Sequence, residues 1–448
     1  MGTGPSGTSA AATIAAQLAN TCADLTPASE RDVVCGRQAR YVAAPGSATE
    51  AAALLATAAE LGLTVVPRGS GSRLDWGAAP ASCDLIVDTR RLDQVIEHAA
   101  GDLVVTVQAG VRLDDLADVL ATAGQRLALD PPPAGNPGGI DARGGTAGGL
   151  IATGLAGPLR FRYGSPRDLL IGITVIRADG KITKSGGKVV KNVAGYDLGK
   201  LFTGSYGTLG LITEATFRLH PKPETSTWIS IECTKPESAA ETAALMADSP
   251  LVPAAIELDW SSAAAPISVS VLLEGDALSV EVRADRMIDL LSRRTRGLPS
   301  DHRKRSDGRS AHPPRTTSNG TKIRITFWAG QLLQVLGVIR VAAAEHGLDP
   351  AIRGSAGAGV LEVDVAASAP AAEVAQFVAR LRAGFGGVGA VAGGPPSVAS
   401  AVVLNAPAEV RDAVDFWGPV PALGLMRAVK DRFDPEHRMA PGRFAGGI

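Results

Sequence analysis

The sequence has few features that would assign it to several common functional classes. Its four cysteines, Cys22, Cys35, Cys83 and Cys233, are scattered without a Cys-x-x-Cys pair. This argues against a self-ligated iron–sulfur cluster or structural zinc site and suggests a reducing, cytoplasmic compartment. The formal net charge is −1, so no overall field favours nucleic acid or an anionic membrane. No apolar run approaches the roughly 18 residues that a membrane-spanning helix needs.

Length and composition predict two or three domains with full cores, since the chain has 448 residues, 45% of them hydrophobic and 20% charged. The glycine-rich texture ends near residue 222, so we expect a first domain over 39–222 and a second over 223–425. The last residues, 426–448, are expected to return to the first domain. Residues 1–38 are expected to be a flexible leader with a first turn, because the start is rich in Gly, Ser and Pro and lacks a basic signal-peptide segment.

Both domains are expected to mix helices and strands, which is the α+β class. Apolar periodicity predicts helices at 49–62, 111–124, 236–247, 279–291, 332–346 and 371–383. Short apolar runs predict strands at 64–66, 84–88, 103–107, 169–177, 228–233, 256–260, 267–273, 323–329, 361–365 and 402–404.

Residues 293–320 interrupt the second domain with a polar, basic and Pro/Gly-rich stretch, which predicts a mobile insertion. The run Arg303-Lys304-Arg305 could contact nucleic acid, but a solvated loop suits a chain of near-zero net charge better. His302 and His312 lack a carboxylate or cysteine cluster, so we expect no metal site.

Three glycine-rich regions are the most informative part of the sequence. The longest runs from Ser185 to Thr213 and holds seven glycines, which admit positive φ and let the backbone approach a ligand closely. The others are Pro67–Ser72, which follows a short strand, and Asp130–Gly157. Each alone could be an ordinary turn region, whereas together they indicate loops around a flat cofactor.

The loop at Pro67–Ser72 suits a phosphate group, because backbone N–H groups converge at a glycine-rich turn after a strand. Arg68 could add charge, and Ser70 and Ser72 could add hydroxyl donors. The loop matches neither the P-loop nor the Rossmann dinucleotide pattern. Arginines near the third region could bind a diphosphate or could form surface ion pairs; these are Arg160, Arg162 and Arg167.

These motifs resemble the FAD-binding domain of the vanillyl-alcohol-oxidase/para-cresol-methylhydroxylase (PCMH) group, and most of all the smaller FAD-binding subunits of bacterial glycolate oxidases. The resemblance implies a two-lobed PCMH-type FAD-binding domain with a second α+β, ferredoxin-like cap domain. It rests on VPRGSGS at 66–72, AGV at 109–111, GGLIAT at 148–153, YGSPRDLLIG at 163–172, GGKVVKNVAGYDLGKLFTGSYGTLGLIT at 186–213 and KDRFDP to PG at 430–442.

The resemblance implies FAD as the cofactor, and noncovalent binding, because these loops carry no histidine or cysteine for a flavin linkage. It assigns cofactor contacts to three groups of positions. They are Pro67, Arg68, Gly69, Ser70, Gly71, Ser72 and Trp76; Gly148, Gly149, Ala152, Thr153, Gly157, Tyr163 and Gly164; and Gly204, Gly207 and Ile212. The catalytic residues stay unassigned, since the chain lacks the HxGDGNxH motif of larger relatives.

The implied function is that of an FAD-binding subunit of a glycolate-type 2-hydroxy-acid oxidase or dehydrogenase. Its implied partners are a larger catalytic flavoprotein and an iron–sulfur subunit, with membrane contact at most peripheral, on the inner face and through partners. One alternative is a free-standing FAD-dependent 2-hydroxy-acid oxidoreductase, in which Arg324, Trp328 and Arg353 could clamp a carboxylate. Another is a scaffold subunit that has lost flavin.

Overall fold

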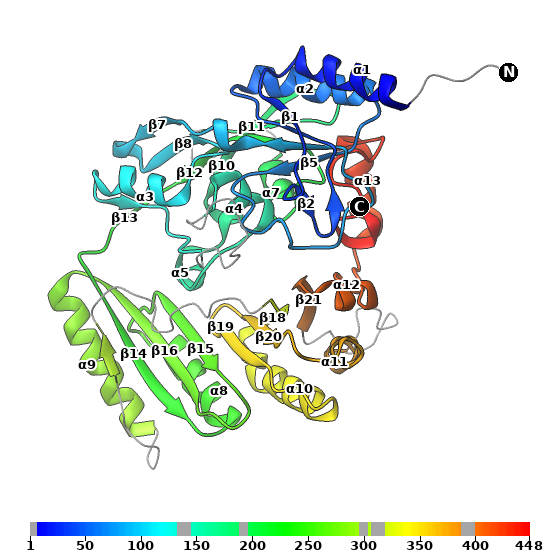
Figure 1. The fold of residues 1–448 in the computed structure, drawn as a ribbon. Helices are drawn as coiled ribbons and strands as arrows, with labels where there is room; N and C mark the ends of the chain where they lie inside the picture. The colour runs from blue at the N-terminus through cyan, green and yellow to red at the C-terminus, as the bar shows by residue number, and fades with distance from the viewer. Residues whose placement is uncertain (1–6, 132–144, 188–195, 295–302, 306–318, 387–398) are drawn as a thin grey trace.

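The computed structural model describes residues 7–131, 145–187, 196–294, 303–305, 319–386 and 399–448. Two lobes are visible in Figure 1. The upper lobe contains the N-terminal half of the chain together with helix α13 (Leu423–Phe433), and the lower lobe contains one large sheet with helices beneath it. The chain combines helices and sheets as expected, so the α+β class is confirmed.

The first sheet of the upper lobe carries the glycine loop at 67–72 on one of its strands. Its order is β1-β4-β6-β5, and β4, β6 and β5 run parallel. Helices α1 (Gly7–Ala19) and α2 (Ala48–Glu60) cover it, and their apolar side chains share one core with the sheet. Ser47 caps α2 by accepting a hydrogen bond from the Glu50 N–H. The strands are β1 (Leu25–Pro27), β4 (Tyr41–Ala43), β5 (Val65–Arg68) and β6 (Leu85–Asp88).

The expectation of a flexible leader over 1–38 needs correction for the part that the structure describes. Helix α1 packs Leu18 into the first core, and Cys22 is buried beside it. The hairpin β2 (Val33–Val34) and β3 (Arg37–Gln38) follows. Ile14 and Ala15 of α1 also pack against this core, although the segment is rich in alanine and has only a weak apolar pattern.

The second sheet of the upper lobe is antiparallel, in the order β11-β10-β12-β8-β7. Helices α3 and α4 pack against it, and the shared core contains Val105, Ile151 and Phe217. The bounds are β7 (Val95–Ala99), β8 (Val104–Gln108), β10 (Leu170–Ile176), β11 (Ile182–Gly186), β12 (Leu211–Arg218), α3 (Leu113–Ala121) and α4 (Ala147–Thr153). Short elements around them are β9 (Gln125–Arg126), β13 (His220–Pro221), α5 (Arg160–Tyr163), α6 (Pro166–Leu169) and α7 (Gly199–Phe202).

The lower lobe is one eight-stranded antiparallel sheet in the order β17-β14-β16-β15-β19-β20-β18-β21. Both halves have the element order strand, helix, strand, strand, helix, strand, and the same strand arrangement, which is the ferredoxin-like motif. They join through the pairing of β15 with β19. The first half is β14 (Thr225–Cys233), α8 (Pro236–Ala247), β15 (Ala255–Trp260), β16 (Ile267–Gly275), α9 (Ala277–Arg294) and β17 (Arg303–Arg305); the second is β18 (Thr321–Phe327), α10 (Leu332–Glu345), β19 (Ala351–Ser355), β20 (Val360–Val365), α11 (Ala371–Gly384) and β21 (Ala399–Asn405).

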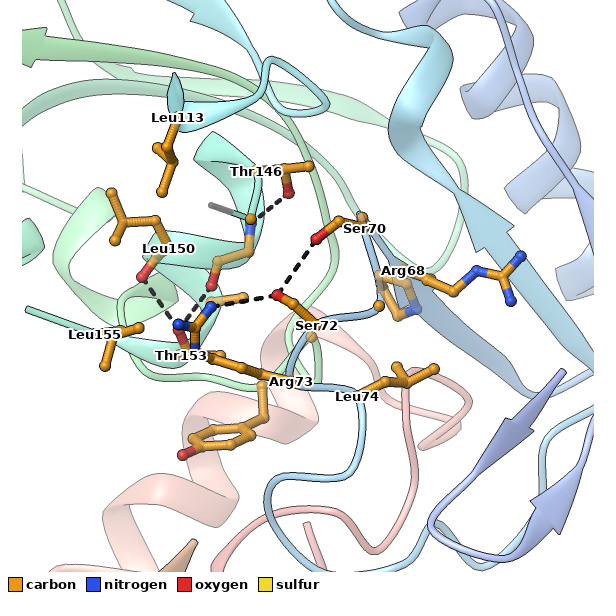
Figure 2. Close-up of a pocket in the computed structure, with 18 of the residues that line it drawn as sticks. Arg68, Ser70, Ser72, Arg73, Leu74, Leu113, Thr146, Leu150, Thr153 and Leu155 are labelled. Carbon is orange, nitrogen blue, oxygen red and sulfur yellow. Dashed lines mark hydrogen bonds between the residues drawn. The ribbon is translucent and has the colours of Figure 1, made fainter. Parts of the chain in front are cut away.

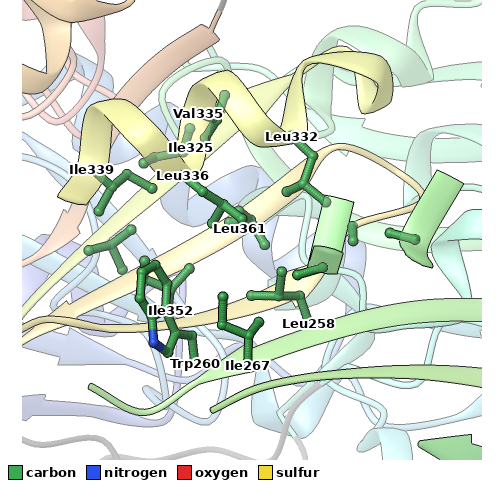
Figure 3. Packing of buried hydrophobic residues seen from close by; sticks show 14 of the residues in the cluster. Leu258, Trp260, Ile267, Ile325, Leu332, Val335, Leu336, Ile339, Ile352 and Leu361 are labelled. Carbon is green, nitrogen blue, oxygen red and sulfur yellow. The ribbon is translucent and has the colours of Figure 1, made fainter. Parts of the chain in front are cut away.

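Alternation along these strands gives the sheet two different faces. One face is apolar and packs on the helices, as Figure 3 shows for Leu258, Ile325 and Leu361. The residues between them lie on the opposite face of the sheet. In Figure 1 the helices lie on one side of this sheet and the upper lobe on the other. Arg126 of β9 bridges the lobes there through Glu274 of β16, at 2.8 and 2.7 Å.

The expected mobile insertion at 293–320 also needs correction where it is described. Helix α9 continues to Arg294, and 303–305 form strand β17, which pairs with β14. The basic run therefore belongs to the edge of the sheet. His302 and His312 lie outside the described residues.

Candidate functional site

Three segments that are far apart in the sequence meet at one pocket in the upper lobe. They are the loop after β5, helix α4 and the turn at Tyr206–Gly207, joined by Leu113, Gly145 and Arg443. The pocket encloses about 660 Å³ of empty space, including space open to solvent. Ten predicted cofactor residues line it: Pro67, Arg68, Gly69, Ser70, Gly71, Ser72, Gly149, Ala152, Thr153 and Gly207.

Glycine is required in the loop for two physical reasons. A Cβ on Gly69 would lie 2.2 Å from Oγ1 of Thr146, so the loop and α4 approach too closely for any side chain. Gly71 has φ +75°, which favours glycine over residues with a Cβ. The hydroxyls of Ser70 and Ser72 lie 3.3 Å apart, which places two polar groups at the pocket (Figure 2).

Helix α4 presents backbone and a hydroxyl to the pocket. Thr146 caps the helix by accepting a hydrogen bond from the Gly149 N–H at 3.3 Å, and Thr153 donates to the Gly149 carbonyl at 2.8 Å. Leu150 and Leu155 supply an apolar wall, which Figure 2 shows beside Leu113. The pocket is therefore apolar on one side and polar on the other, which suits a ligand with a flat ring system and charged groups.

The turn at Tyr206–Gly207 closes the pocket against the strand that leads into the loop. Tyr206 has φ +56°, and its N–H donates to the Ala152 carbonyl at 2.9 Å. A Cβ on Gly207 would lie 3.1 Å from Cδ of Pro67. Burial raises the pKa of the Tyr206 hydroxyl, so this residue is neutral at physiological pH.

The charge expected from Arg68 is already paired. Its guanidinium donates to Asp32 at 2.6 Å and to Asp88 at 3.0 Å, and Figure 2 shows it pointing away from the other labelled side chains. Burial raises the pKa of Asp32, but hydrogen bonds from Arg68 and Ser29 lower it by more. The Asp32 carboxylate therefore stays ionised. Arg68 thus fixes the base of the loop, and the residue also lines the pocket.

Two other arginines line the pocket, and sequence reasoning missed both. Arg73 donates to Oγ of Ser72 at 3.2 Å and lies over the Trp76 ring at 5.6 Å. Burial lowers the pKa of Arg73 to about 10, so it stays cationic at neutral pH. Arg443 is only 3% exposed and donates to the carbonyls of Leu74 and Trp76 at 2.8 and 2.6 Å.

Another arginine, from the lower lobe, holds the same segment of residues 74–77. Arg411, in α12 (Ala408–Ala413), donates to the carbonyls of Gly77 and Asp75 at 2.6 and 3.0 Å. Carbonyls of residues 74–77 are therefore held by side chains that come from the last 40 residues of the chain. Arg73 was visible as a basic residue beside the glycine loop, whereas no sequence signal brings Arg411 and Arg443 to it.

Seven predicted residues do not line this pocket, and most have a structural role nearby. Gly148 and Gly157 allow close backbone approach. A Cβ on Gly148 would lie 2.8 Å from the Cβ of Ala109, and a Cβ on Gly157 would lie 1.9 Å from the Asp130 carbonyl oxygen. Trp76 and Ile212 belong to apolar cores. The remaining three are Tyr163, which bonds Glu274 and Arg126; Gly164, which lies against Asp168; and Gly204, whose N–H donates to Ile151.

The other predicted arginines lie outside the pocket too. Arg162 stacks on Tyr163 and Arg167 is exposed, while Arg160 faces charged residues of the lower sheet. The suggested clamp of Arg324, Trp328 and Arg353 is not assembled as one group. Arg353 pairs with Asp259 at 2.7 Å, and Trp328 is exposed at the end of β18.

Two stretches of the glycine-rich regions lie outside the described residues: 132–144, within Asp130–Gly157, and 188–195, within Ser185–Thr213. Within the described ranges, no three His, Cys, Asp or Glu side chains gather as a metal site would need. No helix in those ranges is long and apolar enough to cross a membrane.

Comparison with solved structures identifies the fold. Substrate-bound p-cresol methylhydroxylase superposes with a TM-score of 0.72 over 96% of both chains, at 14% identity. A 4-ethylphenol oxidase from Gulosibacter chungangensis superposes with a TM-score of 0.68 over 98% of both chains, at 15% identity. Residues 39–186 match the family described as an FAD binding domain. The chain therefore has a PCMH-type fold and contains an FAD-binding domain.

Sequence comparison names more particular relatives. Glycolate oxidase subunit GlcE of Escherichia coli is 37% identical over 40% of this chain and 49% of its own length. Subunit GlcD of Bacillus subtilis is 35% identical over 48% of this chain and 44% of its own length. A D-lactate dehydrogenase of Archaeoglobus fulgidus is 37% identical over 42% of this chain and 41% of its own length. The matched part spans less than half the length of each of these relatives.

Proposed function

We propose that this chain is an FAD-dependent oxidoreductase that acts on glycolate- or lactate-type 2-hydroxy acids and holds FAD noncovalently in the pocket. The observation that carries the proposal is the meeting of the loop at 67–72, helix α4 and the turn at Tyr206–Gly207 at one pocket. The first two of these segments lie within the domain matched as FAD-binding. Relatives named for glycolate and D-lactate oxidation support the substrate class.

The pocket residues fit the chemical character of FAD. Glycines leave backbone exposed where a Cβ would clash, and Ser70, Ser72 and Arg73 offer donors to a diphosphate. The leucine wall offers an apolar surface to a ring system. None of the described lining residues is histidine or cysteine, which supports noncovalent binding. Bound FAD would accept two electrons from a substrate and pass them on singly.

The chain's own residues have two roles in this proposal. Arg411 and Arg443 hold carbonyls of residues 74–77, directly after the loop at 67–72, and we expect this to support the shape of the loop. Tyr206 and the leucines exclude water from one side of the pocket. Preorganisation of this kind lowers the entropic cost of binding the cofactor.

Complex membership is the finer part of the proposal. The names of the GlcD and GlcE relatives refer to subunits, which supports an assembly with a larger catalytic flavoprotein and an iron–sulfur subunit. Such partners would carry any contact with the inner face of a membrane. A free-standing oxidoreductase is the second candidate, and it is favoured by one observation: Arg324, in a row of charged residues of the lower sheet, lies 5.4 Å from the Trp76 ring beside the pocket.

The test is an absorption spectrum of the purified chain, followed by anaerobic titration with glycolate, D-lactate and D-2-hydroxyglutarate. We expect flavin bands that disappear from the protein after acid or heat releases the FAD. Bleaching by a hydroxy acid in the isolated chain would support the free-standing enzyme, and bleaching only with partner subunits would support the complex. A chain that neither carries nor takes up FAD would contradict the proposal and leave the scaffold role.

A further inference from the structure

The segment that continues the glycine loop at 67–72 is seated on the lower lobe. The Gly77 N–H donates to the Leu404 carbonyl of strand β21 at 2.8 Å. Leu404 is also buried in one apolar core with Leu150 and Leu155, and these two leucines line the pocket. The lower lobe therefore contacts both the main chain that follows the loop and the apolar wall of the pocket.

Trp76 is the side chain at which cations from the two lobes meet. It is only 9% exposed and belongs to the same core as Leu404. Cζ of Arg73 lies 5.6 Å from the centre of the Trp76 ring, and Cζ of Arg324, from β18 of the lower lobe, lies 5.4 Å from it. A guanidinium within about 6 Å of an indole is attracted by the electron density over the ring. The indole thus attracts one cation from each lobe.

The position of Arg324 is fixed by the lower sheet. The register of β18 places Arg324 beside Glu362 of β20 and Val402 of β21. Its guanidinium pairs with Glu362 at 3.4 Å, and its Nε is buried without a hydrogen-bond partner among the described residues. Cation–π contacts strengthen where water is excluded, so the Trp76 ring is a substantial partner for this cation. The contact links a regular strand of the lower lobe to the loop segment of the upper lobe.

Arg73 is the member of this group that reaches the pocket. It lines the pocket, and its Nη1 donates to Oγ of Ser72 at 3.2 Å, as Figure 2 shows. A free arginine side chain has many rotamers, and ordering it costs entropy. A neighbouring indole restricts these rotamers before a ligand arrives, which lowers the entropic cost of binding. Trp76 is therefore placed to hold Arg73 ready as a donor to the FAD diphosphate.

We propose that Arg324 is a positioning residue for cofactor binding: it holds the Trp76 indole from the lower lobe, and the indole holds Arg73 at the pocket. The proposal rests on the function proposed above and adds a residue of the other lobe to FAD recognition. Arg324 is not among the residues that line the pocket, so its substitution acts through Trp76 and Arg73. The pocket then has its full FAD affinity only when the lobes are packed together.

A double-mutant cycle on FAD affinity tests the proposal, with flavin fluorescence of the full chain as the readout. We expect Arg73→Gln to weaken FAD binding about tenfold, the loss of one charge-assisted contact. Arg324→Gln should weaken it about fivefold, through loss of the contact with the indole. Because Arg324 acts through Arg73, the double variant should bind within about twofold of Arg73→Gln alone. Trp76→Leu should likewise remove any further effect of Arg324→Gln.

Arg353→Gln is the matched control. Arg353 is aligned with Glu362 on the same face and pairs with Asp259 at 2.7 Å, but β20 separates its strand β19 from β18. This variant also leaves a carboxylate without its arginine, so we expect a similar loss of stability in urea. FAD affinity should change less than about twofold, since no contact with Trp76 is involved in the pairing.

Arg324→Lys shows whether the cation itself is required. It keeps a positive charge for Glu362 and for the indole, so we expect it to bind FAD at least about threefold more tightly than Arg324→Gln. Circular dichroism checks the fold of every variant, and the lysine variant keeps the test decisive if Arg324→Gln does not fold. Equal FAD affinity of a folded lysine variant and the folded glutamine variant would contradict the proposal.

The outcomes separate this role from the cofactor assignment. An effect of Arg324→Gln that persists in the Arg73→Gln background, or that Arg353→Gln reproduces, would overturn the positioning role and leave FAD in the pocket. Unchanged FAD affinity in Arg324→Gln with a higher hydroxy-acid concentration for half-bleaching would place Arg324 at the substrate instead, and would also overturn it. A folded wild-type chain that binds no FAD would overturn the proposed function as well.

Discussion

The cofactor pocket and the charged face of the lower sheet are built in opposite ways. The pocket is made by short loops whose glycines expose backbone, and its apolar wall comes from leucines of α3, α4 and the following turn. The charged face is made by regular strands whose long side chains meet across the register, as Arg324, Glu362, Arg353 and Asp259 do. The pocket offers a ligand mainly main-chain atoms, whereas the charged face offers charged side chains. Substitutions should therefore act on each region by a different mechanism.

The largest effect is expected at the pocket. Replacing Gly71 by Asp adds a side chain at φ +75° and a negative charge beside the loop that would hold the diphosphate. We expect FAD affinity to fall at least about a hundredfold, since about 3 kcal/mol of charge repulsion and displaced contact is involved. Fluorescence titration with FAD measures it.

Gly36→Asp is the control for backbone strain. Gly36 has φ +84°, has open space around it, and does not line the pocket. We expect a similar loss of stability with unchanged FAD affinity. Full FAD occupancy in the Gly71 variant would remove the assignment of this loop to the diphosphate.

The next effect concerns the segment that anchors the C-terminus to the pocket. Lys430 is fully buried and donates to Asp434 at 2.6 Å, to the Thr208 carbonyl at 2.7 Å and to the Met439 carbonyl at 2.9 Å. Lys430→Met leaves the buried Asp434 charge without its cation, which we expect to cost about 3–5 kcal/mol of unfolding free energy. Urea denaturation measures the loss, and FAD affinity should fall with it because Thr208 follows Gly207.

Lys200→Met provides the comparison for an exposed pair. Lys200 and Asp197 lie 3.1 Å apart in solvent, where an ion pair contributes little. We expect a change of less than about 0.5 kcal/mol. Equal effects of the two lysine variants would show that the buried pair does not anchor the segment.

A smaller, pH-dependent effect is expected on the charged face. Glu257 has a pKa of about 8 in the folded chain against 4.5 in the reference state. Between these values the folded state holds a proton that the unfolded state has lost, so stability falls as pH rises. Glu257→Gln removes this loss. We expect its advantage in unfolding free energy to be near zero at pH 4 and to reach roughly 3–5 kcal/mol at pH 8.

Urea midpoints of both proteins from pH 4 to pH 8 test this expectation. A difference that is constant across this range would mean that Glu257 is ionised in the folded chain.

The smallest effect is expected at a predicted cofactor residue that the structure places elsewhere. The Tyr163 hydroxyl lies 3.0 Å from Glu274 and 3.1 Å from Arg126, in the contact between the lobes. Tyr163→Phe should cost about 1 kcal/mol of stability, as for one hydrogen bond in a charged network. FAD affinity should change less than twofold, and a tenfold loss would restore the cofactor role that the sequence motif predicted.

Sequence reasoning was most successful where local pattern decides the structure. Helix α8 spans the predicted residues 236–247, and the ferredoxin-like lower lobe follows from its alternating strands and helices. The loop at 67–72 was recognisable because glycine at positive φ is a local requirement. Strand β19, with Gly354 near its end, was missed because its pairing with β15 and β20 outweighs weak strand propensity.

Sequence reasoning was weaker where glycine serves packing and where partners are distant. The sequence predicts Gly157 as part of a ligand-binding loop, whereas in the structure it allows close contact with the Asp130 carbonyl. Arg443 reaches the Leu74 carbonyl from 369 positions away, and Arg324 meets Trp76 only because the lobes pack together. No local pattern encodes such meetings, since they depend on the tertiary fold.

Hydrogen–deuterium exchange of the full chain with and without FAD tests the central claim most directly. The account predicts that FAD slows exchange together at residues 68–72, 146–153 and 204–207, while α9 and α10 in the lower lobe stay unchanged. Protection confined to other segments, or to only one of the three, would contradict a cofactor gripped by backbone at this pocket.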